Sequence, residues 1–248
     1  MSQSGISDML NDGYTKRHLL AWSLYDFANS GYTTVVITAI FNAYFVSIVA
    51  ENEVWATFLW TLVLSFSYFL AVITGPVLGA YVDVTGSKKK VLFVVTLGCA
   101  LSTIVLSTAG QGDLWFAAVF LIISNYFFSL GENIIASYLP EIAKKESVGR
   151  VSGIGWAVGY FGGILTLALS LVTIFQLQSR GWEAEQYVPI TLIITGAIFL
   201  LAALPTFIYL DKDNTKTWDN LTISFVINRS LDTLRQRHQF VDLYRFLR

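Results

Sequence analysis

Long apolar runs without charged residues constrain the fold of this 248-residue chain more than any other feature. Residues 54–82 and 91–112 contain no charged side chain. A run of about 18 or more such residues is typical of a membrane-spanning helix, because about 20 residues rising about 1.5 Å each cross a hydrocarbon core of about 30 Å. The sequence predicts six such spans, at residues 19–49, 54–82, 91–110, 114–139, 149–177 and 187–210.

The composition agrees with a protein embedded in the lipid bilayer. Hydrophobic residues make up 54% of the chain and charged residues 13%, with a mean hydropathy of +0.59, whereas about 25% of the residues of a soluble domain are charged. The net charge of −1 gives no basic surface for nucleic acid, and the single cysteine, Cys99, cannot form an intramolecular disulfide. The expected fold is therefore an all-α membrane protein, a bundle of six transmembrane helices.

The positive charges are distributed unevenly between the two sides of these spans. Of the 16 Lys and Arg residues, only Arg180 falls in a loop on the second side. Loops rich in lysine and arginine stay in the cytoplasm, so both termini are predicted to be cytoplasmic. The predicted organisation is a cytoplasmic N-terminus at 1–18, a six-helix transmembrane domain at 19–210, and a cytoplasmic linker with an amphipathic helix at 211–248.

The first span carries a polar stripe. Trp22, Asp26, Asn29 and Thr33 recur at steps of four, three and four residues, which places them on one face of a helix, next to Tyr25. An acid inside a span is costly to bury and normally faces a protein interior or a water-filled cavity. The alternative is that Asp26, about two turns from the cytoplasmic end of the span, reaches the lipid headgroups.

The fourth span carries a second polar face. Asn125, Ser129 and Glu132 lie at steps of four and three, followed by Asn133. Glu132 is expected at the same depth as Asp26, so the two acids are predicted to face each other across a cytoplasm-side cavity between the first and fourth spans. Two carboxylates in one low-dielectric site cannot both ionise cheaply, so one is expected to hold a proton near neutral pH. The alternative is that both acids are structural and pair with basic residues of the cytoplasmic loop, Lys144, Lys145 or Arg150.

The candidates for contact with a substrate or for proton coupling are therefore Trp22, Tyr25, Asp26, Asn29, Thr33, Asn125, Ser129, Glu132 and Asn133. Two glycine series are expected to pack against other helices, because glycine allows backbones to approach closely. They are Gly75-x-x-x-Gly79 in the second span and, in the fifth, Gly155, Gly159 and Gly163.

The loop between the second and third spans contains the pattern Gly79-x-x-x-Asp83-x-x-Gly86-x-Lys88. It resembles the loop between the second and third helices of major facilitator superfamily transporters. That resemblance implies a conformational role for these four residues, with the acid contacting a helix of the transporter's second half. Val84 and Ser87 stand where the superfamily pattern usually has arginine. The alternative is a positively charged cytoplasmic loop with a turn glycine.

Three further stretches are similar to the vacuole effluxer family, a branch of the major facilitators that includes autophagy-related amino-acid effluxers and bacterial relatives. They are Trp22-x-x-Tyr25-Asp26-x-Ala28-Asn29-Ser30-x-Tyr32, Tyr138-Leu-Pro140-Glu141-Ile-Ala143, and Gly149-Arg150-Val-Ser152-Gly153-x-Gly155-Trp156-x-x-Gly159-Tyr160-x-Gly162-Gly163. The resemblance implies a secondary active transporter for a small solute, with amino acids as the candidates, coupled to protons and located in a bacterial inner membrane.

Members of this family have two six-helix halves, and this sequence contains one set of six spans. The chain is therefore expected to be the N-terminal half of a major facilitator fold, as a fragment or as a half-transporter that needs a partner chain. A C-terminal six-helix half, on the same or a separate chain, is the expected partner, because such transporters bind substrate between their halves. The alternative function is a membrane scaffold that does not transport.

The sequence argues against an enzyme. Tyr25-Asp26 within a span resembles the Tyr-Asp of intramembrane aspartyl proteases, but the Gly-x-Gly-Asp that accompanies it there does not occur in this sequence. No His-rich, Cys-rich or Gly-Lys-Ser/Thr pattern suggests metal or nucleotide chemistry. We therefore expect no catalytic residue, metal or cofactor.

Overall fold

The computed structural model describes residues 4–210, and the linker and amphipathic helix predicted at 211–248 lie outside the described residues. The elements are α1 (Ser4–Ser7), α2 (Lys16–Tyr32), η1 (Thr33–Ala39), α3 (Ile40–Tyr44), η2 (Phe45–Val49), α4 (Ala56–Thr85), α5 (Lys88–Leu106), α6 (Leu114–Ala136), α7 (Leu139–Ile142), η3 (Lys145–Ser147), α8 (Val148–Gln178) and α9 (Ala184–Tyr209). Of the short segments, η1 and η2 are π-helical and η3 is a 3₁₀ turn.

Six helical segments of the described chain are long and apolar enough to cross a membrane. They are Lys16–Val49, Ala56–Thr85, Lys88–Leu106, Leu114–Ile142, Lys145–Gln178 and Ala184–Tyr209. Residues 4–210 contain no strand, only one isolated antiparallel bridge between Leu10 and Ala143. The predicted fold class, an all-α bundle of six membrane-spanning helices, is confirmed.

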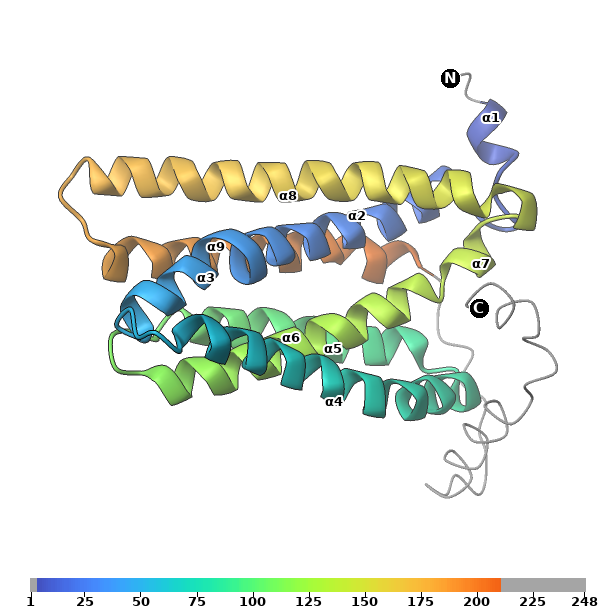
Figure 1. Ribbon diagram of the computed structural model, residues 1–248. Helices are drawn as coiled ribbons and strands as arrows, with labels where there is room; N and C mark the ends of the chain where they lie inside the picture. Colours follow the sequence, from blue (N-terminus) through green and yellow to red (C-terminus); the bar gives the residue numbers. More distant parts are fainter. Residues whose placement is uncertain (1–3, 211–248) are drawn as a thin grey trace, which may run out of the picture.

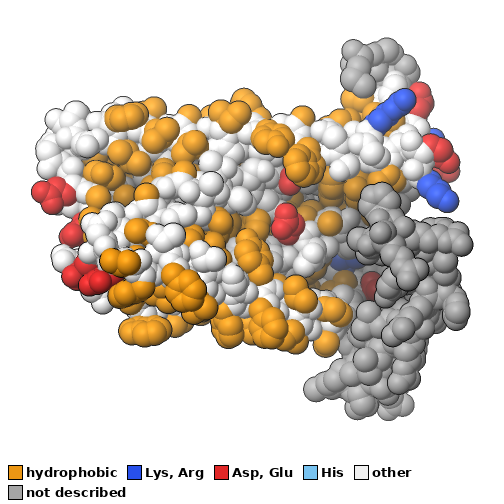
Figure 2. Space-filling view, in the orientation of Figure 1, with side chains coloured by type: hydrophobic (Ala, Val, Ile, Leu, Met, Phe, Trp, Pro, Cys, Tyr) orange, Lys and Arg blue, Asp and Glu red, His pale blue; other side chains and the backbone are white. Residues whose placement is uncertain are grey.

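The six spans lie side by side along one axis (Figure 1). Helix α2 packs against α8 and α9, and α6 packs against α5 and α4. Contacts between α5 and α9 join these two groups into one bundle. The arrangement leaves one face formed by α8, α2, α6 and α4, and Figure 2 shows acidic side chains near the middle of that face, away from both ends.

Hydrogen bonds and aromatic packing hold the interior together. Lipid tails are as apolar as leucine, so burial of apolar surface alone does not drive helices together in a bilayer, and close packing and interhelical hydrogen bonds take its place. The Tyr32 hydroxyl forms a hydrogen bond of 2.8 Å with that of Ser124, and its ring stacks on Phe128. The Thr206 hydroxyl donates to the carbonyl of Ala21, 2.7 Å away, joining α9 to α2.

The first span departs from the single continuous helix that the sequence predicts. It contains two π-helical stretches, η1 and η2, in which each turn accommodates an extra residue. All six residues of the run Thr33-Thr-Val-Val-Ile-Thr38 are β-branched, and such residues crowd the preceding turn of an α-helix. Side chains also bond the carbonyl five residues back: Thr38 Oγ1 donates to Thr33 O at 2.9 Å, and Asn42 Nδ2 to Ile37 O at 3.5 Å. The π geometry therefore begins where the polar stripe of α2 ends.

The turn between α4 and α5 is shorter than expected. Gly86 ends α4 with φ of 63°, a left-handed conformation that glycine adopts without strain, and α5 begins at Lys88. The three lysines therefore occupy the first turn of a helix rather than a loop. Lysine is unfavourable at this positive end of the helix dipole, and Lys88 is compensated by an ion pair with Glu141 and by the Tyr138 ring, 4.7 Å from its Nζ.

The N-terminal segment, expected from sequence to be a polar cytoplasmic extension, packs against the connection between α6 and α8. Asn11 Nδ2 lies within hydrogen-bonding distance of three carbonyl oxygens, those of Pro140 (3.2 Å), Glu141 (2.9 Å) and Ala143 (3.1 Å). Met9 is buried beside them, with 4% of its surface exposed. The signal in the sequence was the small apolar group Ile6, Met9 and Leu10 within a polar stretch.

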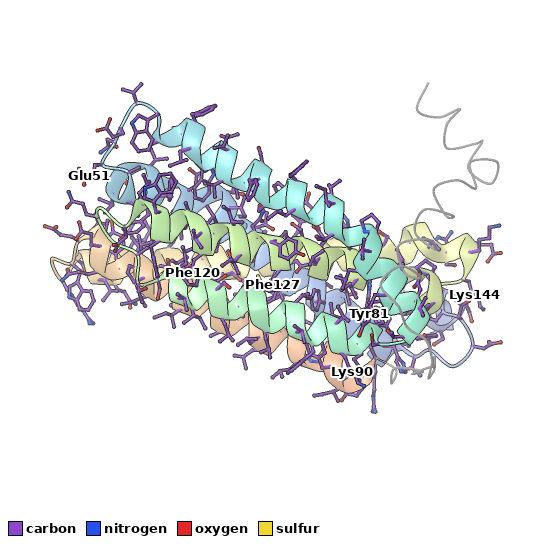
Figure 3. All side chains as sticks on the ribbon, turned by 90° about the horizontal axis from the view of Figure 1, so that it is seen from below. Glu51, Tyr81, Lys90, Phe120, Phe127 and Lys144 are labelled. Carbon is purple, nitrogen blue, oxygen red and sulfur yellow. The ribbon has the colours of Figure 1, made fainter. Side chains whose placement is uncertain are left out.

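Both ends of the described chain lie at the same end of the bundle. The N-terminal segment contacts residues 140–144, and Lys89 Nζ donates to the carbonyl of Leu210 at 2.8 Å. Figure 3 shows Lys90 and Lys144 at this end and Glu51 at the opposite end. An even number of crossings places the ends together, as six spans require. That this lysine-bearing end faces the cytoplasm stays a prediction.

Candidate functional site

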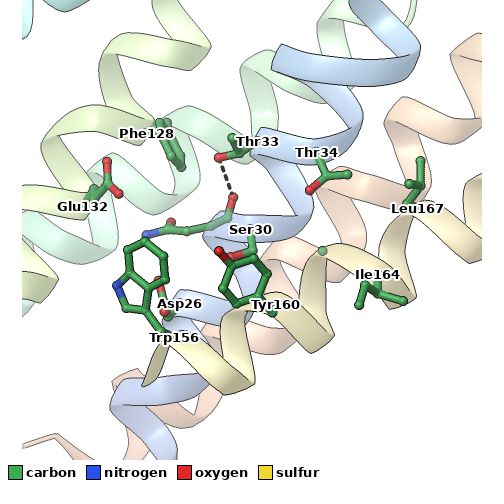
Figure 4. A pocket seen from close by; sticks show the side chains of 12 residues that line it. Asp26, Ser30, Thr33, Thr34, Phe128, Glu132, Trp156, Tyr160, Ile164 and Leu167 are labelled. Atoms are coloured by element: carbon green, nitrogen blue, oxygen red, sulfur yellow. Dashed lines mark hydrogen bonds between the residues drawn. The ribbon is translucent and has the colours of Figure 1, made fainter. Parts of the chain in front are cut away.

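A cavity of about 350 Å³ opens between α2, α6 and α8 (Figure 4). It is lined by Asp26, Asn29, Ser30, Thr33, Thr34, Phe128, Glu132, Trp156, Tyr160, Gly163, Ile164 and Leu167. Four of the candidates predicted from sequence therefore meet here, Asp26, Asn29 and Thr33 from the first span and Glu132 from the fourth.

The two acids of the cavity come from different helices. Asp26 is partly buried on α2, Glu132 is exposed on α6, and both side chains line the same cavity. Within residues 4–210 neither carboxylate forms an ion pair, so the alternative pairing with Lys144, Lys145 or Arg150 is not seen. The cavity thus holds two carboxyl groups that form no ion pair with a basic side chain of the described residues.

The glycines of α8 allow α2 to place its polar stripe directly against that helix. A Cβ atom added at Gly159 would lie 2.7 Å from Asp26 Oδ2 and 2.9 Å from Ser30 Oγ. One added at Gly155 would lie 2.5 Å from the Trp22 ring, and one at Gly163 would lie 2.9 Å from Thr34 Oγ1. Real Cβ contacts are almost never this short. The glycine repeat of α8 therefore packs against residues that are spaced four apart along α2 and the start of η1, and Asp26 packs against Gly159.

The Asn29 side chain has no hydrogen-bond partner among the described residues. Only 4% of the residue is exposed, and neither its amide nitrogen nor its amide oxygen is bonded in the structure. A buried polar group without a partner costs about 1–3 kcal/mol. Its backbone carbonyl is satisfied differently, because it accepts from Thr33 Oγ1 at 3.0 Å. Among the described residues that line the cavity, this amide is the one buried polar side chain whose atoms are both unsatisfied.

Two aromatic side chains, not among the residues predicted from sequence, border the cavity on α8. Trp156 is 63% exposed and Tyr160 is 64% exposed. Their ring centroids lie 5.7 Å apart with a T-shaped orientation. Trp156 and Tyr160 are spaced four residues apart, as are Asp26, Ser30 and Thr34. This spacing was the signal in the sequence for these further lining residues.

Comparison with known proteins shows the family to which the chain belongs. The sequence model of the family described as "vacuole effluxer Atg22 like" matches residues 52–248, more than half of the chain. The chain belongs to this family. The membership predicted from sequence motifs is confirmed, and the protein is a multi-pass integral membrane protein.

One curated relative of this Atg22-like chain is the "Uncharacterized MFS-type transporter YxiO" of Bacillus subtilis (strain 168). It is 31% identical over 164 residues, which cover 64% of this chain and 38% of the relative. The chain thus matches well under half of the length of that protein. No solved structure matches the chain.

Four of the predicted site residues of the Atg22-like chain lie away from the cavity, and three of them connect helices. Trp22 Nε1 donates to Ile135 O at 2.9 Å, and the Tyr25 hydroxyl bonds that of Thr96 at 2.8 Å. Asn125 Nδ2 donates to Ser67 Oγ at 2.6 Å, and Ser129 Oγ donates to Asn125 O at 2.8 Å. These polar side chains join α2 to α6 and α5, and α6 to α4, or bond within α6.

The motif of the second span lies beside a second, smaller cavity. This cavity of about 170 Å³ between α4 and α6 is lined in part by Gly75, Gly79, Asp83 and Asn133. A Cβ added at Gly75 or Gly79 would meet nothing within 4 Å, so in the described chain no helix packs on this glycine face. Asp83 is exposed, and no ion pair of it is found within residues 4–210.

Proposed function

We propose that this chain forms the N-terminal half of a major facilitator transporter that moves a small solute across the membrane in exchange with, or together with, protons. The observation that carries the proposal is the cavity in which Asp26 of α2 and Glu132 of α6 meet without a described cationic partner. Acids at intramembrane positions commonly belong to proton relays and substrate pathways. Membership of the Atg22-like family supports the same reading.

The cavity has properties that suit a transport site. Its volume of about 350 Å³ lies in the range of small-molecule pockets, about 300–1,000 Å³. It opens on one face of the bundle, and major facilitators bind their substrates where two six-helix halves meet. The C-terminal half, on the same or a separate chain, is therefore proposed to supply the opposite wall. Amino acids are the proposed solutes, from the family to which the chain belongs.

Proton coupling is proposed to act through the two carboxylates. Each carboxylate can take up and release a proton, and protonation of one relieves the repulsion between the charges. Binding of a solute beside them changes the cost of carrying the second charge, which links the number of protons bound to the occupancy of the cavity. The lysine-bearing end of the bundle is proposed to face the cytoplasm of a bacterial inner membrane.

Flux in liposomes tests the proposed function. The full-length protein is reconstituted, a pH gradient is imposed, and uptake of a mixture of radiolabelled amino acids is followed with and without a protonophore. Gradient-dependent uptake that Asp26→Asn and Glu132→Gln both diminish is expected, while Glu53→Gln, an exposed acid outside the cavity, serves as the matched control. The absence of gradient-dependent flux, with or without a supplied C-terminal half, would favour the scaffold alternative.

A further inference from the structure

The charges that line the α2–α6–α8 cavity indicate the sign of what it binds. Asp26 and Glu132 line it, and no lysine, arginine or histidine of residues 4–210 does so. Two carboxylates near lipid-facing helices, where screening by water is reduced, attract cations and repel anions. A solute that enters with a negative group foremost would meet repulsion from both acids.

The Asn29 amide indicates that the cavity binds more than a proton. Its oxygen can accept a hydrogen bond and its nitrogen can donate two, yet neither atom has a partner although only 4% of the residue is exposed. It lies one helical turn from Asp26 along the same lining face of α2. A solute that carries both a donor and an acceptor would satisfy the amide and recover the cost of its burial.

The rest of the lining combines the hydroxyl groups of Ser30, Thr33 and Thr34 with aromatic and apolar side chains. Trp156 and Tyr160 present exposed rings to the cavity, and a cation over the face of such a ring is attracted by its quadrupole. Phe128, Ile164 and Leu167 complete an apolar surface. Together these groups fit a protonated amine attached to an apolar body.

We propose that this cavity is an ammonium subsite, in which Asp26 and Glu132 bind the protonated amine of the solute, Asn29 bonds a polar group next to it, and the Trp156 and Tyr160 rings pack on its apolar part. The proposal rests on the transport function proposed above and adds the chemical class that this half of the protein recognises. If the solute is an amino acid, this half takes its amino group, and its carboxylate must be bound outside this cavity.

Three matched probes test the subsite by calorimetric titration of the purified full-length protein at neutral pH. They are 2-phenylethylamine, which carries only the ammonium group; phenylalanine, which carries both charges; and 3-phenylpropanoate, which carries only the carboxylate. The carboxylate probe is expected to bind at least tenfold more weakly than either of the two probes that carry an ammonium group. Equal or tighter binding of 3-phenylpropanoate, or no saturable binding of the amine, would overturn the subsite.

Variants assign the binding to the cavity. Asp26→Asn and Glu132→Gln are each expected to weaken 2-phenylethylamine binding roughly tenfold or more, the loss of one hydrogen bond to a charged group. Glu53→Gln is the matched control and should leave affinity unchanged. Amine affinity that survives both cavity substitutions would contradict the proposal, and if a variant does not fold, the selectivity among the probes on the unmodified protein still decides it.

The subsite and the transport function fail in different ways. Selective amine binding without flux of any probe in liposomes would support the subsite and contradict the transport function. Flux of 3-phenylpropanoate that exceeds flux of 2-phenylethylamine would support transport and contradict the subsite.

Discussion

Substitution of single glycines in α8 tests the close packing of α2 on which the whole cavity depends. A Cβ at Gly162 would collide with the backbone of α2, meeting the Phe27 carbonyl oxygen and, at 2.7 Å, the Phe27 Cα. A Cβ at Gly153, on the same helix, would meet nothing within 4 Å. The pair therefore separates helix propensity, which both substitutions share, from the clash, which only Gly162→Ala introduces.

The magnitudes follow from two opposing effects. Alanine is favoured over glycine inside a helix by about 1 kcal/mol, and overpacking costs about 1–3 kcal/mol. At Gly162 the obstacle is backbone that no side-chain rotation can move, so the upper end applies and the net loss is about 2 kcal/mol. For a chain of this size that lowers Tm by about 4–8 °C, whereas Gly153→Ala raises it by up to about 2–4 °C.

The assay is thermal unfolding of the purified variants in one detergent, followed by the loss of monodisperse protein on size-exclusion chromatography. A control with Gly159→Ala belongs in the same series, because the atoms nearest its Cβ are the ends of the Asp26 and Ser30 side chains, which can rotate away. Its Tm is therefore expected to fall between those of the other two. Equal Tm values for Gly162→Ala and Gly153→Ala would refute the packing of α2 on α8.

Three further predictions concern the ends of the bundle. Asp83→Asn is expected to change Tm by less than about 2 °C, because no ion pair of Asp83 is found within residues 4–210. This limit corresponds to about 0.5 kcal/mol, which is typical of a surface substitution. A larger drop in Tm would require a partner for the Asp83 carboxylate. Asn11→Ala removes the donor shared by three carbonyls and should raise amide hydrogen exchange of the N-terminal segment about fivefold or more, as loss of about 1–3 kcal/mol implies; unchanged exchange contradicts that anchoring role. Cysteines at Glu183 should react with an impermeant thiol reagent from outside cells and those at Lys89 only from inside; labelling of both from one side contradicts the predicted topology.

The fold could be predicted from the sequence because a bilayer imposes few alternatives. Charge-free runs of membrane-spanning length, separated by short polar loops, leave little freedom in where the helices lie, and the six segments found agree with those expected to within a few residues. Two local features were not predictable in the same way. The π-helical turns of the first span depend on which carbonyls Thr38 and Asn42 reach, and the anchoring of Asn11 depends on a contact between residues more than 120 apart.

Helical periodicity predicted part of the candidate site. Periodicity places Asp26, Asn29 and Thr33 on one face of the first span, and the structure puts all three on the cavity. It does not distinguish a side chain that lines a cavity from one that bonds a neighbouring helix, which is why Trp22, on this stripe, and Tyr25, next to it, are found in interhelical hydrogen bonds. The contribution of α8 depended on the packing of its glycines against α2, a relation between two helices that neither sequence pattern contains alone.

Asp26 and Glu132 are proposed to share one site whose protonation is coupled to solute transport. The most direct test is a double-mutant cycle on the full-length protein in liposomes, in which the pH dependence of solute uptake is measured for the unmodified protein, Asp26→Asn, Glu132→Gln and the double variant. Residues that share a site are non-additive, so each single substitution is expected to flatten the pH profile and the double variant to add little. Independent, additive effects, or a single variant that keeps the unmodified pH profile at normal insertion and Tm, would contradict the shared site.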